Sequence, residues 1–344
     1  MDKIKIGIAG LGRSGWGIHC RIISQLTELY QIVSVCDKDE KRIKEANEIF
    51  NCKVYTDYDE FLKDENTELV VVSTFSSLHA EHTIKALKSG KNVICEKPMA
   101  TNLEDADQMI KIAKETGKIL TIFQNRRYSP DFLKVKEIVE SGIIGKVILI
   151  KMYQHSFGRR WDWQTLKKYG GGLLNNWGPH LIDQALQIFG EEEPEIFCQM
   201  EKTLTLGDTE DHVKIILKGK NSPTIDIEIT LCCCYPQENW LVMGTNGGIK
   251  GTTNRLTWKF FNPSDLPPRK VEELPTPDRS YNREEIPWKE EQIWELTEKD
   301  KEYEKNFYKD LYETIKNNKP LKITPESVRR VMWVIEKCYQ IANI

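Results

Sequence analysis

A glycine pattern near the N-terminus has the composition and spacing of a loop that holds a pyrophosphate. The segment Gly10–Gly15 reads G-x-G-x-x-G and separates an apolar run from an amphipathic stretch, which is the context that makes the pattern informative. The first glycine permits a tight turn, the second lets the backbone approach the phosphates, and the third lets helix and strand pack closely. The free N–H groups at the start of the next helix favour negative charge. The segment therefore predicts a dinucleotide site.

Asp37 ends the second apolar run and bears on the identity of that dinucleotide. A carboxylate there accepts hydrogen bonds from the adenosine ribose hydroxyls and repels a 2′-phosphate, which favours NAD over NADP. Lys38 and Lys41 keep NADP open, because cationic side chains at this point accommodate the phosphate. The structural alternative for Asp37 is a cap at the start of the next helix. We expect NAD as the cofactor.

Lys97 is placed to do chemistry beside that cofactor. Thr74–His79 closes one apolar run and Cys95–Pro98 closes the next. In an open α/β sheet the carboxyl ends of the strands line the ligand crevice, so Lys97 would point at the nicotinamide end of the site. A lysine just outside a buried strand is only partly solvated, and its pKa falls toward the range useful for proton transfer. Without this context, Glu96 and Lys97 would be an ordinary surface pair.

These residues need a parallel sheet to bring them to one edge, and the first third of the chain predicts it. Short apolar runs rich in β-branched residues are typical of buried parallel strands. The stretches between them have the apolar spacing of helices that pack one face on a sheet. This alternation predicts a doubly wound α/β Rossmann domain over residues 1–124. The expected strands are Ile4–Ala9, Ile32–Cys36, Leu69–Thr74, Asn92–Cys95 and Ile119–Gln124, and the expected helices are His19–Thr27, Glu40–Phe50, His79–Lys88 and Leu103–Glu115.

The pattern changes after about residue 125. Longer strands with period-two character predict an α+β domain with a large, mostly antiparallel open sheet over residues 125–344. Residues 262–290 are rich in proline and charge and predict a long surface excursion, and helices within residues 302–341 close the chain. The expected elements are the helix Phe132–Ser141, the strands Val147–His155, His212–Leu217, Thr224–Tyr235 and Trp240–Met243, and the helices Glu302–Lys316 and Pro325–Ile341.

Composition restricts the class of protein. The 344 residues exceed what one hydrophobic core usually organises, which favours two domains. The net charge of -3 argues against a nucleic-acid partner or an anionic membrane surface, and no apolar run approaches the ~18 residues that span a bilayer. The nine cysteines include no C-x-x-C pair and predict neither disulfides nor a metal site. The first residues lack the pattern of a signal peptide, so we expect a cytoplasmic location.

The chain resembles the glucose–fructose oxidoreductase/inositol dehydrogenase (Gfo/Idh/MocA) family over nearly its whole length. The resemblance rests on the glycine loop, on Glu96-Lys97-Pro98 and above all on Gly170–Asp183, GGGLLNNWGPHLID. It implies that Lys97 contacts the substrate and the nicotinamide ribose, that a cis bond precedes Pro98, and that His180 is the general base. Histidine also suits that role chemically, because it titrates near neutral pH. The alternative is a buried structural histidine.

Asn176 departs from the pattern of the family, which commonly has Asp four residues before the histidine. On one helix the two positions share a face, so Asn176 can hydrogen-bond the substrate or the imidazole. It cannot supply the negative charge that would stabilise a protonated His180. We therefore predict that His180 is a weaker base here and that Lys97, in a geometry fixed by Asn176, carries more of the catalysis.

The predicted site combines these residues with a set of aromatic and charged neighbours. The catalytic candidates are Lys97, His180 and Asn176. The cofactor-binding candidates are Gly10, Leu11, Gly12, Arg13, Ser14, Gly15, Asp37, Lys38, Thr74, Phe75, His79, Glu96, Lys97, Pro98 and Asn125. Flat aromatic faces stack on sugars, although any single Trp is as readily a core residue. The substrate-binding candidates are Lys97, Tyr153, Arg160, Trp161, Trp163, Asn176, Trp177 and His180. Arg126 and Arg127 either bind the cofactor or a substrate carboxylate, or begin a solvated helix.

These observations predict an NAD-dependent oxidoreductase that transfers hydride between nicotinamide and a secondary carbinol of a sugar, a cyclitol or a sugar derivative. One alternative is a glycosidase that uses tightly bound NAD for transient oxidation. The other is a non-catalytic NAD-binding sensor, which the Asn at position 176 keeps open. An antiparallel sheet with one open face often pairs between subunits, and the resemblance implies a homodimer or homotetramer.

Overall fold

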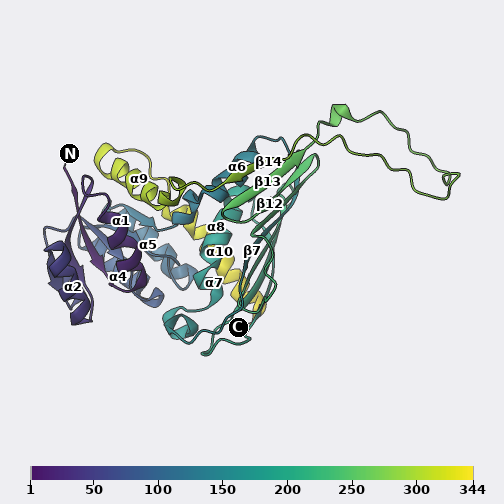
Figure 1. Ribbon diagram of the computed structural model, residues 1–344. Helices are drawn as coiled ribbons and strands as arrows, with labels where there is room; N and C mark the ends of the chain where they lie inside the picture. Colours follow the sequence, from purple (N-terminus) through teal and green to yellow (C-terminus); the bar gives the residue numbers. More distant parts are fainter. Residues whose placement is uncertain (1, 344) are drawn as a thin grey trace.

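The computed structural model describes residues 2–343, which form two sheets with helices between and around them (Figure 1). The N-terminal sheet has six parallel strands, and the C-terminal sheet has eight strands that are mostly antiparallel. The predicted fold class, a Rossmann domain followed by an α+β domain with a large open sheet, is confirmed. Within residues 2–343, no helix combines the length and the apolar character that crossing a membrane requires.

The parallel sheet has the strand order β3-β2-β1-β4-β5-β6. All residues of β4 are buried, as expected for a strand covered on both faces. The sequence pattern does not predict β3, because a strand of three residues shows no periodicity. The strands are β1 (Ile4–Ala9), β2 (Tyr30–Cys36), β3 (Lys53–Tyr55), β4 (Leu69–Val72), β5 (Asn92–Cys95) and β6 (Leu120–Ile122), and the helices are α1 (Arg21–Ile23), α2 (Glu40–Phe50), α3 (Tyr58–Leu62), α4 (His79–Lys88) and α5 (Leu103–Thr116).

The second sheet has the order β14-β13-β12-β11-β7-β10-β9-β8. Its inner face is apolar, with Ile225, Ile227 and Ile229 of β10 buried against the helices. The chain here forms α6 (Pro130–Glu140), β7 (Val147–His155), α7 (Leu173–Asn176), α8 (Gly178–Phe189), β8 (Glu195–Glu201), β9 (His212–Lys218), β10 (Thr224–Thr230), β11 (Trp240–Gly244), β12 (Gly247–Gly251), β13 (Arg255–Phe260) and β14 (Gln292–Glu295). The sequence pattern misses β8 and β12 to β14, and it extends β10 five residues too far, to Tyr235.

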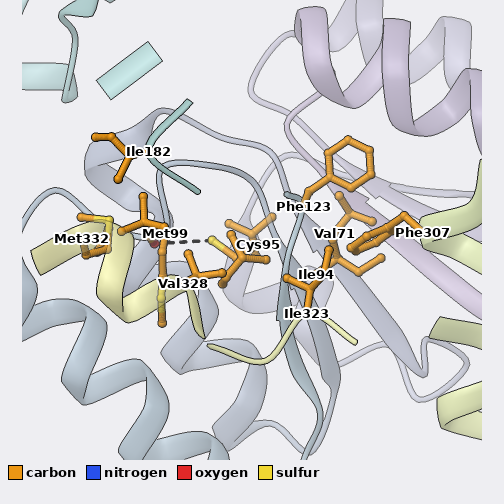
Figure 2. Packing of buried hydrophobic residues seen from close by; sticks show 14 of the residues in the cluster. Val71, Ile94, Cys95, Met99, Phe123, Ile182, Phe307, Ile323, Val328 and Met332 are labelled. Atoms are coloured by element: carbon orange, nitrogen blue, oxygen red, sulfur yellow. Dashed lines mark hydrogen bonds between the residues drawn. The ribbon is translucent and has the colours of Figure 1, made fainter. Parts of the chain in front are cut away.

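The last two helices, α9 (Glu304–Asn317) and α10 (Pro325–Ala342), connect the two parts of the molecule. The Tyr30 hydroxyl donates to the backbone oxygen of Tyr308 in α9 at 2.6 Å, and the ring of Phe307 lies 4.8 Å from that of Phe123. Helix α10 packs against α5, α8 and β8. Figure 2 shows side chains of both helices beside those of the parallel strands. The boundary near residue 125 stays a prediction.

Residues 262–291 extend away from the edge of the second sheet as a long arm (Figure 1). Two side-chain hydrogen bonds join the outgoing and returning segments of the arm: Arg269 donates to Glu284 and Asn282 donates to Glu272, both at 3.1 Å. Most of its residues are exposed, as the proline- and charge-rich composition predicts.

Candidate active site

The glycine loop has the geometry that a pyrophosphate needs. Gly10 has a φ of +89°, and a Cβ there would collide with the backbone of Ser73. A Cβ at Gly15 would overlap the carbonyl oxygen of Gly10, so only glycine allows this close packing. At Gly12, in contrast, a Cβ would meet no atom within 4 Å. That open space lets a phosphate approach the backbone N–H groups, and the loop therefore fits the predicted dinucleotide.

Asp37 lies beside this loop and is held by it. Its Oδ2 accepts a hydrogen bond from the Leu11 N–H at 2.7 Å, and its Oδ1 accepts one from the Asp39 N–H at 2.9 Å. The helix-cap alternative for Asp37 is wrong, because the side chain that caps α2 is that of Asp39. Lys38 is exposed. The Arg42 guanidinium lies 3.6 Å from the Asp37 carboxylate. Sequence reasoning missed Arg42, because it lies in the first turn of α2 and outside the motif at the strand end.

Lys97 follows β5, and Asn176 at the end of α7 fixes its ammonium group. The Lys97 Nζ donates to the backbone oxygen of Asn176 at 2.9 Å and to its Oδ1 at 3.2 Å. Burial lowers the pKa of Lys97, and the nearby Glu96 opposes that shift. The Lys97–Pro98 peptide bond is cis, as the resemblance implies. An ammonium group has three hydrogens, so one remains for a substrate oxygen.

His180 lies in the first turn of α8. Burial, together with the charges of Lys97 and Arg126, lowers the pKa of His180 well below its usual value. The imidazole is therefore neutral at neutral pH and can accept a proton. Its Nδ1 has no hydrogen-bond partner among the residues that the structure describes. Of the two partners open to Asn176, the substrate and the imidazole, the structure shows no hydrogen bond to the imidazole among the described residues; Trp177 separates α7 from α8, and Asn176 accepts from Lys97.

A buried chain of hydrogen bonds supports the residue before Lys97. Glu96 accepts from the Lys97 N–H at 3.0 Å, and its other oxygen lies 3.1 Å from His19 Nε2. His19 Nδ1 lies 2.6 Å from the Tyr308 hydroxyl, which links β5 to α9. Burial raises the pKa of Glu96, but the contact with His19 and the charges of Lys97 and His79 together leave that pKa below its usual value. Sequence reasoning missed His19 and Tyr308, because no local signal pairs residues so far apart along the chain.

The segment after β4 supports the same turn. The two ring nitrogens of His79 lie 2.7 Å from the backbone oxygen of Pro98 and 3.3 Å from that of Thr74. Burial lowers the pKa of His79. The Thr74 hydroxyl lies 3.1 Å from His82 Nδ1. His79 therefore holds the strand ends of β4 and β5 together, beside the predicted cofactor site.

The predicted aromatic residues lie in three different surroundings. Phe75 stacks on Tyr169 with ring centroids 4.7 Å apart and meets the edge of Trp163 at 5.1 Å. Trp177 lies 6.1 Å from His180, next to the catalytic candidates. Trp161, which precedes Asn176 and His180 in the sequence, is 75% exposed. Tyr169 is a further aromatic neighbour that the sequence reasoning did not select.

Three further polar candidates, Arg160, Asn125 and Arg127, have protein partners. Arg160 donates to Asp162 at 2.8 Å, and Asn125 donates to Glu304 at 2.9 Å. Arg127 forms a two-bond ion pair with Asp183, its shorter contact being 2.6 Å, which gives it a structural partner inside the protein. Within residues 2–343, no group of three or more His, Cys, Asp and Glu side chains could hold a metal ion.

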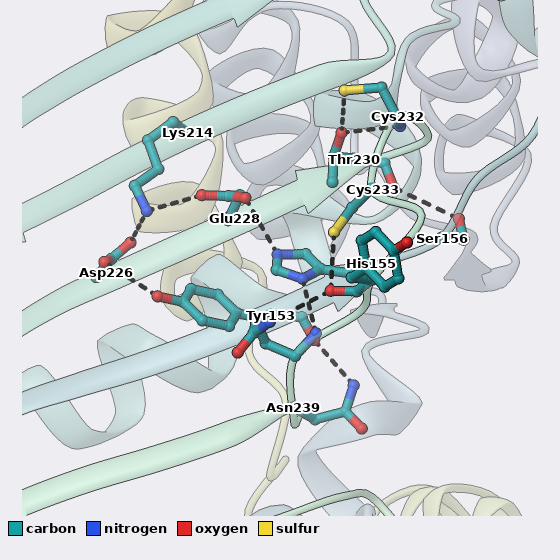
Figure 3. Close-up of polar contacts among 12 residues, drawn as sticks. Tyr153, His155, Ser156, Lys214, Asp226, Glu228, Thr230, Cys232, Cys233 and Asn239 are labelled. Carbon is teal, nitrogen blue, oxygen red and sulfur yellow. Dashed lines mark hydrogen bonds and ion pairs between the residues drawn. The ribbon is translucent and has the colours of Figure 1, made fainter.

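Tyr153 requires a correction to the predicted substrate-binding set. Ile150 and Met152 of β7 are buried under the helices. Because successive side chains of a strand point to opposite faces, Tyr153 lies on the other face of the sheet. There it stacks on His155 at 4.7 Å within a polar cluster on β7, β9 and β10 (Figure 3). The structure does not bring Tyr153 together with Lys97.

Two family models match most of the chain. Residues 4–124 match a model described as an oxidoreductase family with an NAD-binding Rossmann fold, and residues 132–250 match the GFO/IDH/MocA C-terminal domain. The chain is 34% identical to the myo-inositol 2-dehydrogenase of Thermotoga maritima over 260 residues, 74% of this chain and 77% of that protein. It is also 34% identical to scyllo-inositol 2-dehydrogenase (NADP(+)) IolW of Bacillus subtilis over 231 residues, 66% of this chain and 58% of that protein.

The fold is similar to that of solved oxidoreductases. The structure of the oxidoreductase YvaA from Bacillus subtilis superposes with a TM-score of 0.84 at 21% identity, covering 99% of this chain and 97% of that one. The predicted enzyme class, a nicotinamide-dependent dehydrogenase acting on CH–OH groups, is confirmed at the level of the family by the inositol dehydrogenases above. The chain belongs to the Gfo/Idh/MocA family of NAD-binding oxidoreductases.

Proposed function

We propose that this protein is an NAD-dependent dehydrogenase that oxidises a secondary carbinol of a sugar, a cyclitol or a sugar derivative. The observation that carries the proposal is the buried contact of the Lys97 ammonium group with both oxygens of Asn176, beside the neutral His180. These groups stand where β5 ends, on the sheet edge that carries the glycine loop, and this is where α/β folds bind ligands. The relatives named as inositol dehydrogenases support a polyol substrate.

Each side chain has a defined task in this reaction. A bound nicotinamide supplies the hydride acceptor. The neutral imidazole of His180 removes the proton of the substrate hydroxyl. The third ammonium hydrogen of Lys97 donates to the same oxygen and stabilises the negative charge that develops there. Asn176 orients the ammonium group through its two oxygens, so that little reorganisation is needed during the reaction.

We expect NAD rather than NADP. The Leu11 N–H fixes the carboxylate of Asp37 at the end of β2, where it can bind ribose hydroxyls and repel a 2′-phosphate. Arg42 is half-exposed and pairs with Asp37 at 3.6 Å, which reduces its availability for that phosphate. The relative IolW is named for NADP(+), so both cofactors belong in the test.

The test is nicotinamide reduction by the purified protein with a panel of cyclitols, aldoses, polyols and sugar acids, with each cofactor in turn. We expect at least one panel member to reduce NAD faster than NADP. Lys97→Met and His180→Asn each remove one proton-handling group, and each should lower kcat by at least about 100-fold. The matched control is Lys202→Met, because Lys202 is exposed.

NADH binding is measured through the fluorescence of NADH. It shows whether each variant still folds and holds the cofactor. Turnover that survives both the Lys97 and His180 substitutions would contradict the proposal. Tight NADH binding without turnover by any panel member would favour the sensor alternative. The relatives above do not favour the glycosidase alternative.

A further inference from the structure

Three arginine side chains act electrostatically on Lys97. Besides burial, the charges of Arg126, Arg13 and Arg160 each lower the pKa of the Lys97 ammonium group. The carboxylate of Glu96 acts in the opposite direction. Glu96 is buried and already committed to the hydrogen bonds described above. Glu96 is therefore not free to neutralise these arginines.

Arg126 differs from the other two arginines. Arg160 is paired with Asp162 at 2.8 Å. Arg13 is exposed within the glycine loop, where the phosphates of a dinucleotide are expected. Arg126 forms no ion pair within 4.0 Å with a carboxylate of residues 2–343. Its guanidinium lies over the ring of Trp177, 4.7 Å from the centroid, and this stacking orients the group without neutralising it.

Arg126 lies over Trp177, whose ring centroid is 6.1 Å from that of His180, so it is near the reacting groups. Its charge acts on His180 as well as on Lys97. The charge of Arg126 also lowers the pKa of Asp131, although burial raises that pKa overall. The Asp131 carboxyl group is buried and accepts a hydrogen bond from the Trp240 indole N–H at 2.9 Å, so it already has a partner. A partly buried cation without a partner costs free energy. Binding of an external anion would remove that cost.

We propose that Arg126 binds a carboxylate of the substrate, and that this dehydrogenase therefore acts on sugar acids such as uronates and aldonates rather than on neutral sugars. The inference rests on the proposed dehydrogenase function and specifies its substrate class. A guanidinium presents two parallel N–H donors that match the two oxygens of a carboxylate. The contact with the Trp177 ring holds the guanidinium in place. The bound anion also offsets the positive charge around the base His180.

The experiment compares matched pairs of compounds: D-glucuronate with D-glucose, D-galacturonate with D-galactose, and D-gluconate with D-glucitol, with D-glucose 6-phosphate as a different anion. For each, kcat/KM is measured with NAD, and binding to the NADH complex is measured by fluorescence. We expect the carboxylate member of at least one pair to be preferred about tenfold or more. Arg126→Gln should lower that preference about tenfold to a hundredfold, since it removes a charge-assisted pair.

Two further variants separate charge from geometry. Arg126→Lys keeps the charge but not the fork, so it should retain only part of the preference. Arg159→Gln is the matched control, because Arg159 is exposed and donates to the backbone oxygen of Leu204. The preference should be unchanged in that variant.

Four results would overturn the inference. The first two are equal or better binding of the neutral partner in every pair, and a preference for the carboxylate that survives Arg126→Gln. The third is a preference for the sugar phosphate over the sugar acids. The fourth is weaker NADH binding by Arg126→Gln without a change in sugar preference. The binding measurement needs no turnover. Sugar acids that bind selectively but are not oxidised would count against the dehydrogenase and still support the role of Arg126, and oxidation of neutral sugars alone would do the reverse.

Discussion

At the scale of single residues, the contact between Lys97 and Asn176 determines how the site titrates. The Asn176 Oδ1 lies 3.2 Å from the Lys97 ammonium group and carries no net charge. Burial lowers the pKa of Lys97 and that of His180. A carboxylate in place of the amide would favour the charged form of both groups and raise both pKa values.

We therefore predict that Asn176→Asp moves the acidic limb of the pH profile of kcat/KM upward by about 1 pH unit or more. The group that must be deprotonated would bind its proton more tightly, so activity below neutral pH falls relative to the wild type. The measurement is kcat/KM from pH 5 to 10, with a substrate identified by the nicotinamide-reduction panel. Asn254→Asp, at an exposed position, is the control. An unchanged profile would show that Asn176 does not tune these groups.

At the scale of elements, the start of α7 depends on a carboxylate from another part of the chain. Glu210 is buried, and its Oε1 accepts the Leu174 N–H of α7 at 2.9 Å. Gly172 precedes that helix with a φ of +108°, and a Cβ there would collide with the Glu210 side chain. The glycine run before Asn176 thus serves to admit Glu210. Burial raises the pKa of Glu210 to about 7.

The raised pKa makes a prediction about stability. The folded protein holds the Glu210 proton more tightly than the unfolded chain, so this group reduces the free energy of unfolding as the pH rises from about 4.5 to about 7. Glu210→Gln stays neutral and keeps an acceptor. It should match the wild type near pH 4.5 and be more stable by about 1–3 kcal/mol at pH 8.

Urea unfolding at both pH values, with the exposed Glu193→Gln as control, measures this difference. The same stability difference between variant and wild type at both pH values would mean that Glu210 titrates normally. Lower stability of Glu210→Gln at pH 8 would mean that the ionised carboxylate is needed to hold α7.

At the scale of the whole molecule, we predict that subunits associate through the outer face of the second sheet. Phe197, Met243 and Ile293 are 51%, 43% and 53% exposed, and alternation along their strands places them opposite the face that packs on the helices. The polar cluster around Tyr153 lies on this same face (Figure 3). Exposed apolar side chains on an open sheet favour a homodimer or homotetramer.

Light scattering should therefore give a mass of two or four times the 40.0 kDa of one chain. The double substitution Phe197→Lys and Met243→Lys places charges on this face and should lower the measured mass, because unpaired charges are costly in an interface. Ile49→Lys, at a residue of α2 that is 60% exposed, should leave the mass unchanged. A wild-type mass of one chain would contradict the prediction.

The sequence by itself determined the features that local patterns specify. The glycine loop, β4 and β5 follow from runs of adjacent residues, because backbone turns and burial on both faces impose local constraints. Lys97 and His180 belong to short motifs for the same reason. The sequence also indicated the change from parallel to antiparallel strands near residue 125, since the period of hydrophobicity changes there.

Only the tertiary structure decided which distant residues meet. The contact between Lys97 and Asn176, the chain from Glu96 through His19 to Tyr308, and the cap of α7 by Glu210 all join separate elements. The face on which Tyr153 lies could not be predicted, because β7 alternates between two faces and only packing against the helices shows which one is inner. Hydrogen bonds and charge pairs act at distances of a few ångströms, so they depend on the folded arrangement and leave no local pattern in the sequence.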